Sequence, residues 1–205
     1  MVNMKKRILL FIFVVSFIKP AFAQITKNNW LVGGIGIFNS TTYNSTSGAP
    51  GQQVTHLQLS PDIGYFLFDK FAIGLKLGFE SWRYQSVGQN SLTKNTTYSF
   101  GPFVRYYLLS IQKEFNLLIE GNYQHGIERG GGSSAPPGQP LQFSIIQYNK
   151  NTFSIAGGPV IYFNSSVGLE FLIGYSSSKY AQYEGNNNTV QVGIGLQIHL
   201  EKDKK

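Results

Sequence analysis

The sequence predicts an all-β protein, an eight-stranded antiparallel up-and-down β-barrel that crosses a membrane. Three observations support this fold class. Apolar and polar residues alternate along several segments, which is the period of a β-strand with two different faces. Only 13% of the residues are charged while 15% are aromatic, whereas about 25% of the residues of a typical soluble domain are charged. Along the chain, long polar connections between these segments alternate with short ones.

The N-terminus has the pattern of a secretory signal peptide. Lys5, Lys6 and Arg7 precede the apolar run 8–18, and the small-x-small triplet Ala21-Phe22-Ala23 follows. We therefore expect residues 1–23 to be a signal peptide that is cleaved after Ala23. The apolar run is too short for the roughly 20 residues of a membrane-spanning helix, although a retained N-terminal anchor stays open as the alternative.

The mature chain is expected to be a barrel over residues 24–200, with a charged periplasmic tail at 201–205. Four of the 17 basic residues lie in the leader, so thirteen oppose ten acidic residues and the mature net charge is about +3. This weak charge gives no reason to expect a nucleic-acid partner. The chain has no cysteine, so disulfides cannot stabilise an exported protein here, and a closed sheet in a bilayer is one substitute.

The first half of the mature chain contains four expected strands. The segment 30–38 is rich in glycine and its phase is ambiguous, but it is needed to complete the count. Segment 54–67 has the strongest alternation, with leucine and isoleucine at odd positions and Gln, Ser and Asp between them. In 71–80 the apolar residues again hold the odd positions, and in 99–106 a phenylalanine and a valine oppose Arg105.

The second half contains four more. In 115–124 leucine and isoleucine oppose Glu120, and in 153–163 Phe and Ile alternate with Ser and Ala. Segment 167–176 places Glu170 between two apolar neighbours, and 189–200 alternates valine, isoleucine and leucine with Gln, Gly and His. Period two in each segment predicts a strand with one apolar and one mixed face.

The connections separate a membrane barrel from a soluble sandwich or a lipocalin-like barrel, which the alternation alone also fits. The long polar connections are 39–53, 85–94, 130–140 and 176–188. The short ones lie around 69–70, 111–114 and 164–166. Short periplasmic turns and long outer loops are typical of transmembrane barrels, so both termini are expected in the periplasm.

Aromatic residues are expected to form two belts at the membrane interfaces. The belt near the chain start and the short turns would comprise Trp30, Phe66, Phe68, Phe71, Tyr106, Tyr107, Phe115, Tyr162 and Phe163. The belt toward the long loops would comprise Trp82, Tyr84, Tyr98, Tyr123, Tyr148, Tyr175, Tyr180 and Tyr183. Their separation of about ten strand residues matches a tilted strand crossing a hydrocarbon core.

Three segments resemble strands of a known family: 101–107 (GPFVRYY), 157–163 (GGPVIYF) and 167–175 (VGLEFLIGY). They look like the outer-membrane β-barrel, or porin family, domain of Gram-negative envelopes, which is similar in fold to the small OmpA-type and OmpX-type barrels. The resemblance covers essentially the whole mature chain and implies outer-membrane lipid, lipopolysaccharide and the barrel assembly machinery as partners of a monomer. Members usually end on an aromatic residue, whereas here Leu200 is followed by five further residues, four of them Lys or Asp and one Glu.

The inward-facing positions are expected to hold a network of buried charges. Its members would be Asp62, Lys76, Glu80, Arg105, Glu120 and Glu170. Because opposite residues share a face, an odd turn such as 68–70 would place Asp62 opposite Lys76, and an even loop centred on 112–113 would place Arg105 opposite Glu120. Glu80 and Glu170 would share these cations. Buried charges must be paired, so an ionic plug is expected; charges at the wet barrel mouths are the alternative.

No catalytic, metal or cofactor site is expected. His56, His125 and His199 lie on different strands, without the serine two residues on that membrane hydrolase barrels would require. No carboxylate stands at metal-ligand spacing from them. The sequence therefore predicts a non-enzymatic barrel that is structural or binds a surface ligand through its loops, with a narrow channel for small solutes as the alternative.

Overall fold

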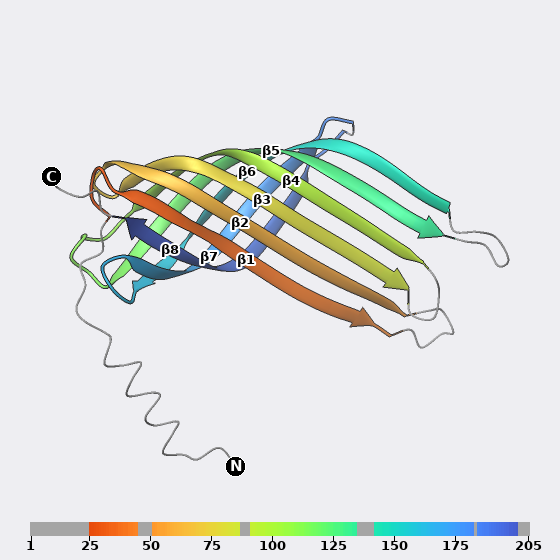
Figure 1. The fold of residues 1–205 in the computed structure, drawn as a ribbon, viewed down its shortest axis with the longest axis horizontal. Coiled ribbons are helices and arrows are strands. Elements are labelled where there is room, and N and C mark those ends of the chain that lie inside the picture. The colour runs from red at the N-terminus through yellow and green to blue at the C-terminus, as the bar shows by residue number, and fades with distance from the viewer. Residues whose placement is uncertain (1–24, 45–50, 87–90, 135–141, 183, 201–205) are drawn as a thin grey trace, which may run out of the picture.

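The computed structural model describes residues 25–44, 51–86, 91–134, 142–182 and 184–200 (Figure 1). The expected signal peptide and the expected tail at 201–205 lie outside these ranges. Among the described residues, no helix is long and apolar enough to span a membrane.

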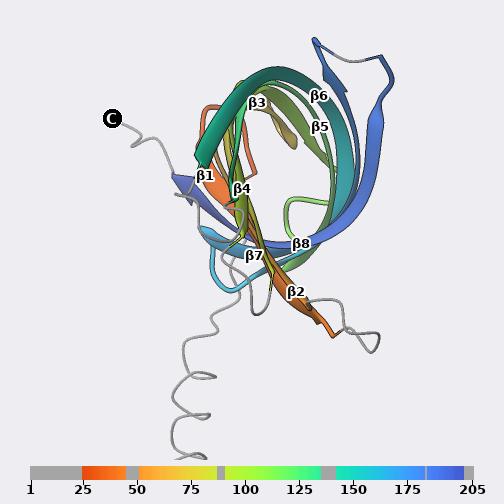
Figure 2. The same cartoon turned by 90° about the vertical axis from the view of Figure 1, so that its right-hand side faces the viewer.

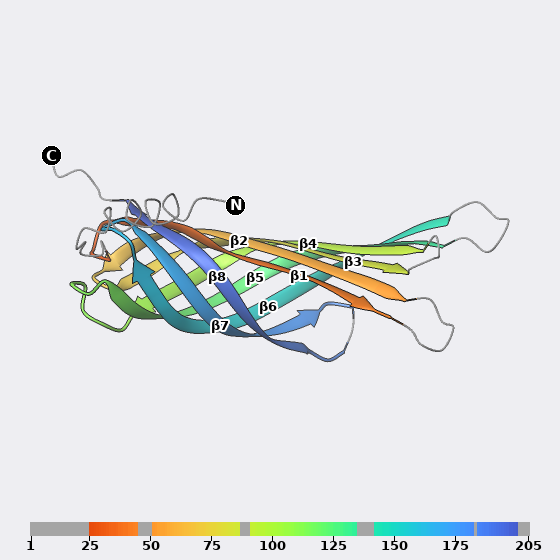
Figure 3. The same cartoon turned by 90° about the horizontal axis from the view of Figure 1, so that it is seen from below.

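Eight antiparallel strands form a closed barrel in chain order, which confirms the predicted up-and-down architecture. The strands are β1 (Trp30–Tyr43), β2 (Gln52–Phe68), β3 (Phe71–Ser86), β4 (Leu92–Tyr107), β5 (Phe115–Ser134), β6 (Gln142–Tyr162), β7 (Val167–Tyr180) and β8 (Asn187–Leu200). The short turns gather at one end of the barrel and the extended hairpins at the other (Figures 1 and 3).

The strands are longer than the alternation predicted, and the connections are correspondingly shorter. The expected loop 130–140 is paired strand through Ser134, and the expected loop 39–53 is paired strand at both ends. Beyond the apolar zone both faces of a strand meet polar surroundings, so the hydropathy pattern is lost while backbone pairing continues. Threonine and tyrosine, which favour strands, dominate the first extension at 41–43.

The turn between β2 and β3 differs from the expected odd loop. Phe68 pairs with Phe71 across the two-residue turn Asp69-Lys70, and a bulge between Phe66 and Phe68 supplies the odd residue. Lys70 has φ 68°, a left-handed value that few residues other than glycine adopt. Its N–H donates to the carbonyl of Ile25 at 2.8 Å, so the turn also anchors the segment that precedes β1.

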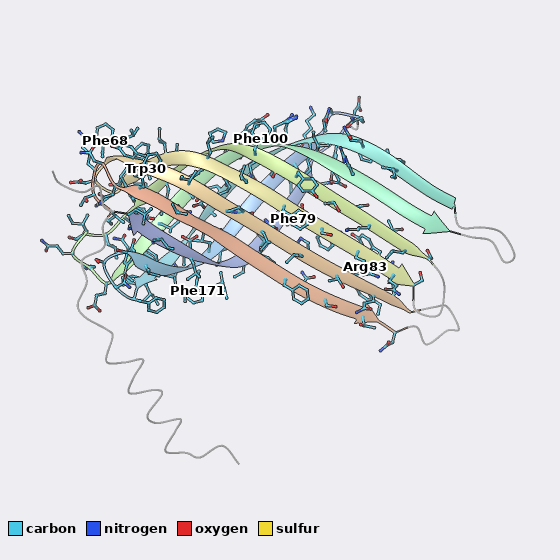
Figure 4. All side chains as sticks on the ribbon, viewed as in Figure 1. Trp30, Phe68, Phe79, Arg83, Phe100 and Phe171 are labelled. Atoms are coloured by element: carbon cyan, nitrogen blue, oxygen red, sulfur yellow. The ribbon has the colours of Figure 1, made fainter. Side chains whose placement is uncertain are left out.

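Apolar side chains cover the outer wall of the barrel. Trp30, Phe68, Phe100 and Phe171 project away from the ribbon in Figure 4, and most of the large outward residues of every strand are exposed. Soluble proteins rarely expose a continuous apolar surface of this extent. A barrel in a bilayer, by contrast, requires one.

The aromatic belts are smaller than predicted because several members face inward. Phe66, Tyr107 and Tyr162 are buried inside the barrel, and Trp82 and Tyr180 donate hydrogen bonds to the interior carboxylates Glu80 and Glu128. Residues two apart on a strand share a face, so Tyr107 must follow Arg105 inward. Tyr183 lies outside the described residues.

Candidate functional site

Five charged side chains meet inside the barrel, nearer to its short-turn end than to the extended hairpins. Asp62, Lys76, Arg105, Glu120 and Glu170 come from β2, β3, β4, β5 and β7, and all are buried. The register pairs Asp62 with Lys76 and Arg105 with Glu120.

Two of the three remaining strands, β1 and β8, leave space for this cluster with glycine. A Cβ at Gly33 would lie 3.1 Å from Asp62 Oδ1, and a Cβ at Gly195 would lie 2.6 Å from Glu170 Oε1. Small residues on two strands therefore make room for long side chains from the other strands.

Arg105 is the centre of the network. Its Nε donates to Glu120 Oε2 at 3.0 Å, and its Nη2 lies 3.3 Å from Asp62 Oδ2. Its Nη1 donates to Glu170 Oε2 at 3.3 Å and to Gln197 Oε1 at 3.2 Å. One guanidinium thus links four side chains from four strands.

Lys76 completes the network with two contacts. Its ammonium pairs with Glu120, and it lies 3.4 Å from Asp62 Oδ2. Three carboxyl groups therefore share two cations, and Asp62 Oδ1 and Glu170 Oε1 are buried without a hydrogen-bond partner. The five residues together cross the lumen; we call them the Arg105 network.

An aromatic and polar layer lies between this network and the short turns. Tyr107 donates to Gln197 Oε1 at 2.6 Å, and Gln197 Nε2 donates to the hydroxyl of Tyr162 at 3.1 Å. The ring of His199 packs 5.4 to 6.2 Å from the rings of Phe66, Tyr107 and Tyr162. The predicted aromatic belt placed Tyr107 and Tyr162 on the outer wall, although strand phase points to this inner layer, since Tyr107 and Gln197 share a face with Arg105 and Gly195.

Glu80 does not belong to the Arg105 network, so the expectation that it shares those cations is wrong. It accepts from Trp82 Nε1 at 3.0 Å, and its carboxylate lies 3.1 Å from His56 Nε2 and 3.4 Å from Lys150 Nζ. It stands four residues beyond Lys76 on the same face of β3, so a different set of neighbours surrounds it. Glu170, by contrast, contacts Arg105.

Glu128 joins this second cluster. It accepts from the Tyr180 hydroxyl at 2.7 Å and from Thr97 at 3.4 Å, and it lies 3.9 Å from Lys150. We call Glu80, Glu128 and Lys150, with His56 and Trp82, the upper cluster. Alternation does not identify Lys150 or Glu128, because they lie in extensions of β5 and β6 outside the predicted segments 115–124 and 153–163.

A polar cavity of about 120 Å³ lies between the upper cluster and the Arg105 network. It adjoins a smaller one of about 60 Å³ that reaches Lys76 and Glu120. Hydroxyl and amide side chains dominate both linings, and the shared members include Gln58, Ser60, Gln124, Ser154 and Gln191.

The three histidines occupy unrelated surroundings. His56 stacks on Trp82 with ring centroids 3.8 Å apart, His125 contacts Asn151 on the outer face at 2.8 Å, and His199 is buried among aromatic rings. Within the described part of the chain, no three His, Cys, Asp or Glu side chains are grouped so as to hold a metal ion.

Comparisons with known proteins find similarity at the level of structure. No family model matches the sequence, and no curated protein matches it. The N-terminal β-barrel domain of Pseudomonas aeruginosa OprF is 12% identical, with a TM-score of 0.39 over 85% of this chain and 98% of that one. Neisserial surface protein A (NspA) is 15% identical, with a TM-score of 0.42 over 83% of this chain and 96% of that one. Both neighbours are eight-stranded outer-membrane barrels.

Proposed function

We propose that the protein is a non-enzymatic integral barrel of the bacterial outer membrane, plugged by the Arg105 network. The observation that carries this proposal is the network itself, which draws charged side chains from five of the eight strands into contact across the lumen. An eight-stranded barrel has an interior just wide enough for its own side chains. A cross-linked set of long side chains in that interior therefore blocks an axial path for solutes.

The outer wall supports the membrane location. Its exposed apolar side chains match the lipid-facing band of a transmembrane barrel. In this proposal the precursor is exported, cleaved after Ala23 and inserted as a monomer by the barrel assembly machinery. Outer-membrane lipid and lipopolysaccharide then surround it.

The extended hairpins give the barrel its outward surface. The β5–β6 hairpin is the longest, with pairing that continues to Ser134 and Gln142. We propose that these hairpins serve a structural role or bind a surface partner. The upper lumen is polar, which keeps a narrow channel for small solutes as a second candidate.

Conductance of the refolded protein in a planar bilayer separates the two candidates. The wild-type protein is expected to give no steady discrete openings, because the Arg105 network fills the lumen. The double variant Lys76→Ala/Glu120→Ala removes one cation and one anion, so it widens the lumen without changing its net charge, and discrete openings are expected.

A matched control, Lys94→Ala/Glu114→Ala, removes one exposed charge of each sign. Like the wild type, it should give no steady discrete openings. Steady wild-type openings of the same size as those of the Lys76→Ala/Glu120→Ala variant would contradict the plug and support the channel.

A further inference from the structure

The seam between β1 and β8 is closed over only half its length. Seven residues of each strand pair, from Trp30 with Leu200 to Gly36 with Ile194. Beyond them β1 continues to Tyr43 in pairing with β2, and β8 begins at Asn187 in pairing with β7. Residues 37–43 and 187–193, all within the described strands, are not paired with each other. The two strands diverge visibly toward the extended hairpins (Figures 1 and 2).

Both strands are long enough to pair over their whole length. Continuing the register would place Ile37 opposite Gly193 and Tyr43 opposite Asn187, with a partner for every residue between. Unpaired strand edges are costly where they meet lipid, which supplies no hydrogen bonds. This applies to the part of the opening at Phe38, Val190 and Val192, whereas residues 41–43 lie beyond the apolar zone. Because β1 and β8 could pair further and do not, we expect another molecule to occupy the opening and satisfy its edges.

The outer rim of the opening is apolar. Phe38 is 69% exposed, Val190 72% and Val192 66%. Val190 pairs with Tyr175, which belongs to the aromatic belt on the side of the extended hairpins. The opening therefore lies at the level where hydrocarbon meets lipid headgroups.

The inner side of the opening leads to the polar cavity. Thr189 and Gln191 of β8 line that cavity, and Ile35 of β1 lines its smaller extension. A single water needs about 10–15 Å³, so a cavity of about 120 Å³ admits a larger polar group. The axial approaches are narrowed by the Arg105 network on one side and the upper cluster on the other.

The chemistry of the lining selects an uncharged group. Lys76 and Glu120 at one limit and Lys150 and Glu80 at the other are engaged in ion pairs. What the cavity offers besides these pairs is mainly hydroxyl and amide groups. A charged headgroup would enter without a counterion, which is costly away from water.

We propose that the half-open seam and the cavity behind it bind a membrane amphiphile with an uncharged, hydroxylated headgroup. The headgroup enters sideways between β1 and β8 and hydrogen-bonds to Gln191 and the neighbouring hydroxyls. The hydrocarbon chain stays outside, against Phe38, Val190 and Val192. A strand from a second copy would satisfy the open edges as well, but it would leave the polar cavity unused. The proposal goes beyond the plugged barrel, because a closed lumen and a lateral site are compatible.

A disulfide across the open seam tests the proposal. The chain has no cysteine, so the pair Thr42→Cys/Asn188→Cys, which stand opposite each other if the register continues, can form only the intended bridge within one copy. The protein is placed in phosphatidylcholine nanodiscs, and binding of dodecyl β-D-glucoside is measured by native mass spectrometry and by calorimetry. The reduced protein should bind one molecule, and oxidation should weaken binding at least tenfold.

Two controls make the result specific. The pair Val32→Cys/Ile198→Cys bridges the part of the seam that is already closed, so its oxidation should leave binding unchanged. Gln191→Leu should weaken binding, whereas Gln112→Leu, in an exposed turn, should not. Dodecyl phosphate and glucose alone should both bind at least tenfold more weakly than the glucoside.

Three results would overturn the proposal. They are equal binding by the oxidised and reduced forms of the Thr42→Cys/Asn188→Cys variant, equal binding of dodecyl phosphate, and disulfides that join two copies through this edge. The last would assign the seam to a dimer interface. None of them bears on conductance, so failure here is distinguishable from failure of the plug.

Discussion

Arg105 holds the interior together through a geometry that no other side chain offers. A guanidinium presents five N–H donors in a planar fork, and here the fork reaches Glu120, Glu170, Asp62 and Gln197. A lysine at this position would carry the same charge but could not direct donors at four groups. The network therefore depends on this residue more than on any one carboxylate.

The variant Arg105→Met tests that dependence. It leaves Asp62 and Glu170 buried without their guanidinium partner, and breaking a buried ion pair from one side costs about 3–5 kcal/mol. The free energy of unfolding, measured by urea titration in phosphatidylcholine vesicles with tryptophan fluorescence, should fall by that amount. Arg83→Met, at an exposed position on the outer wall (Figure 4), should change it by less than about 0.5 kcal/mol. Equal losses in the two variants would show that burial of the charge is not the cause.

Three strands are interrupted by proline in the same way. Pro61, Pro102 and Pro159 keep their pairing with the preceding strand. The ladder to the following strand omits the proline and its neighbour in each case. Proline has no backbone N–H to donate, so the break falls where that donor would be needed. The residue before Pro102 and Pro159 is glycine, which lets the next strand come close.

Gly101 and Gly121 are a matched pair for testing this close approach. A Cβ at Gly101 would lie 1.8 Å from the carbonyl oxygen of Tyr123, whereas a Cβ at Gly121 meets only Val104, at 3.7 Å. Gly101→Ala should therefore destabilise the barrel by about 1–3 kcal/mol, the usual cost of overpacking. Gly121→Ala should be neutral or stabilising by about 0.5–1 kcal/mol, since glycine weakens a strand interior. Urea titration of both variants checks this, and a similar loss in both would contradict it.

At the scale of the whole molecule, the ends of the chain define an orientation. β1 begins and β8 ends beside the short turns, with Trp30 paired to Leu200, and the extended hairpins lie at the opposite end (Figure 3). In an outer membrane the short turns face the periplasm. The hairpins are then expected outside the cell.

An inserted epitope tests this orientation. Placed after Gly185, between β7 and β8, it should be labelled by antibody on intact cells. Placed between Ser165 and Ser166, in the short turn between β6 and β7, it should be labelled only after the outer membrane is permeabilised. The reverse pattern would contradict the orientation.

Strand phase predicted much of this molecule. Alternation located seven of the eight strands, and the first, 30–38, was added to complete the count. Parity placed Asp62 opposite Lys76 and Arg105 opposite Glu120, since a face is decided by counting residues in twos. Parity does not tell which residues of different strands lie at the same level along the barrel axis. Glu80 was therefore grouped with Lys76 and Arg105, whereas it pairs with Lys150. Hydropathy alone assigned Tyr107 and Tyr162 to the outer wall, although a tyrosine serves equally in a buried hydrogen-bonded layer. The open seam depends on how two distant strands meet, which no local pattern records.

The short seam also has a consequence for the order of folding. Its paired residues are between 158 and 170 positions apart along the chain, whereas every other strand pairs with its neighbour in sequence. Loop closure becomes more costly with separation, and contacts between distant residues slow folding. The seven neighbouring strand pairs can therefore assemble as a curved sheet before the first and last strands meet. In the final step of folding, β1 and β8 then pair progressively from the short-turn end, and the pairing stops at Gly36 and Ile194.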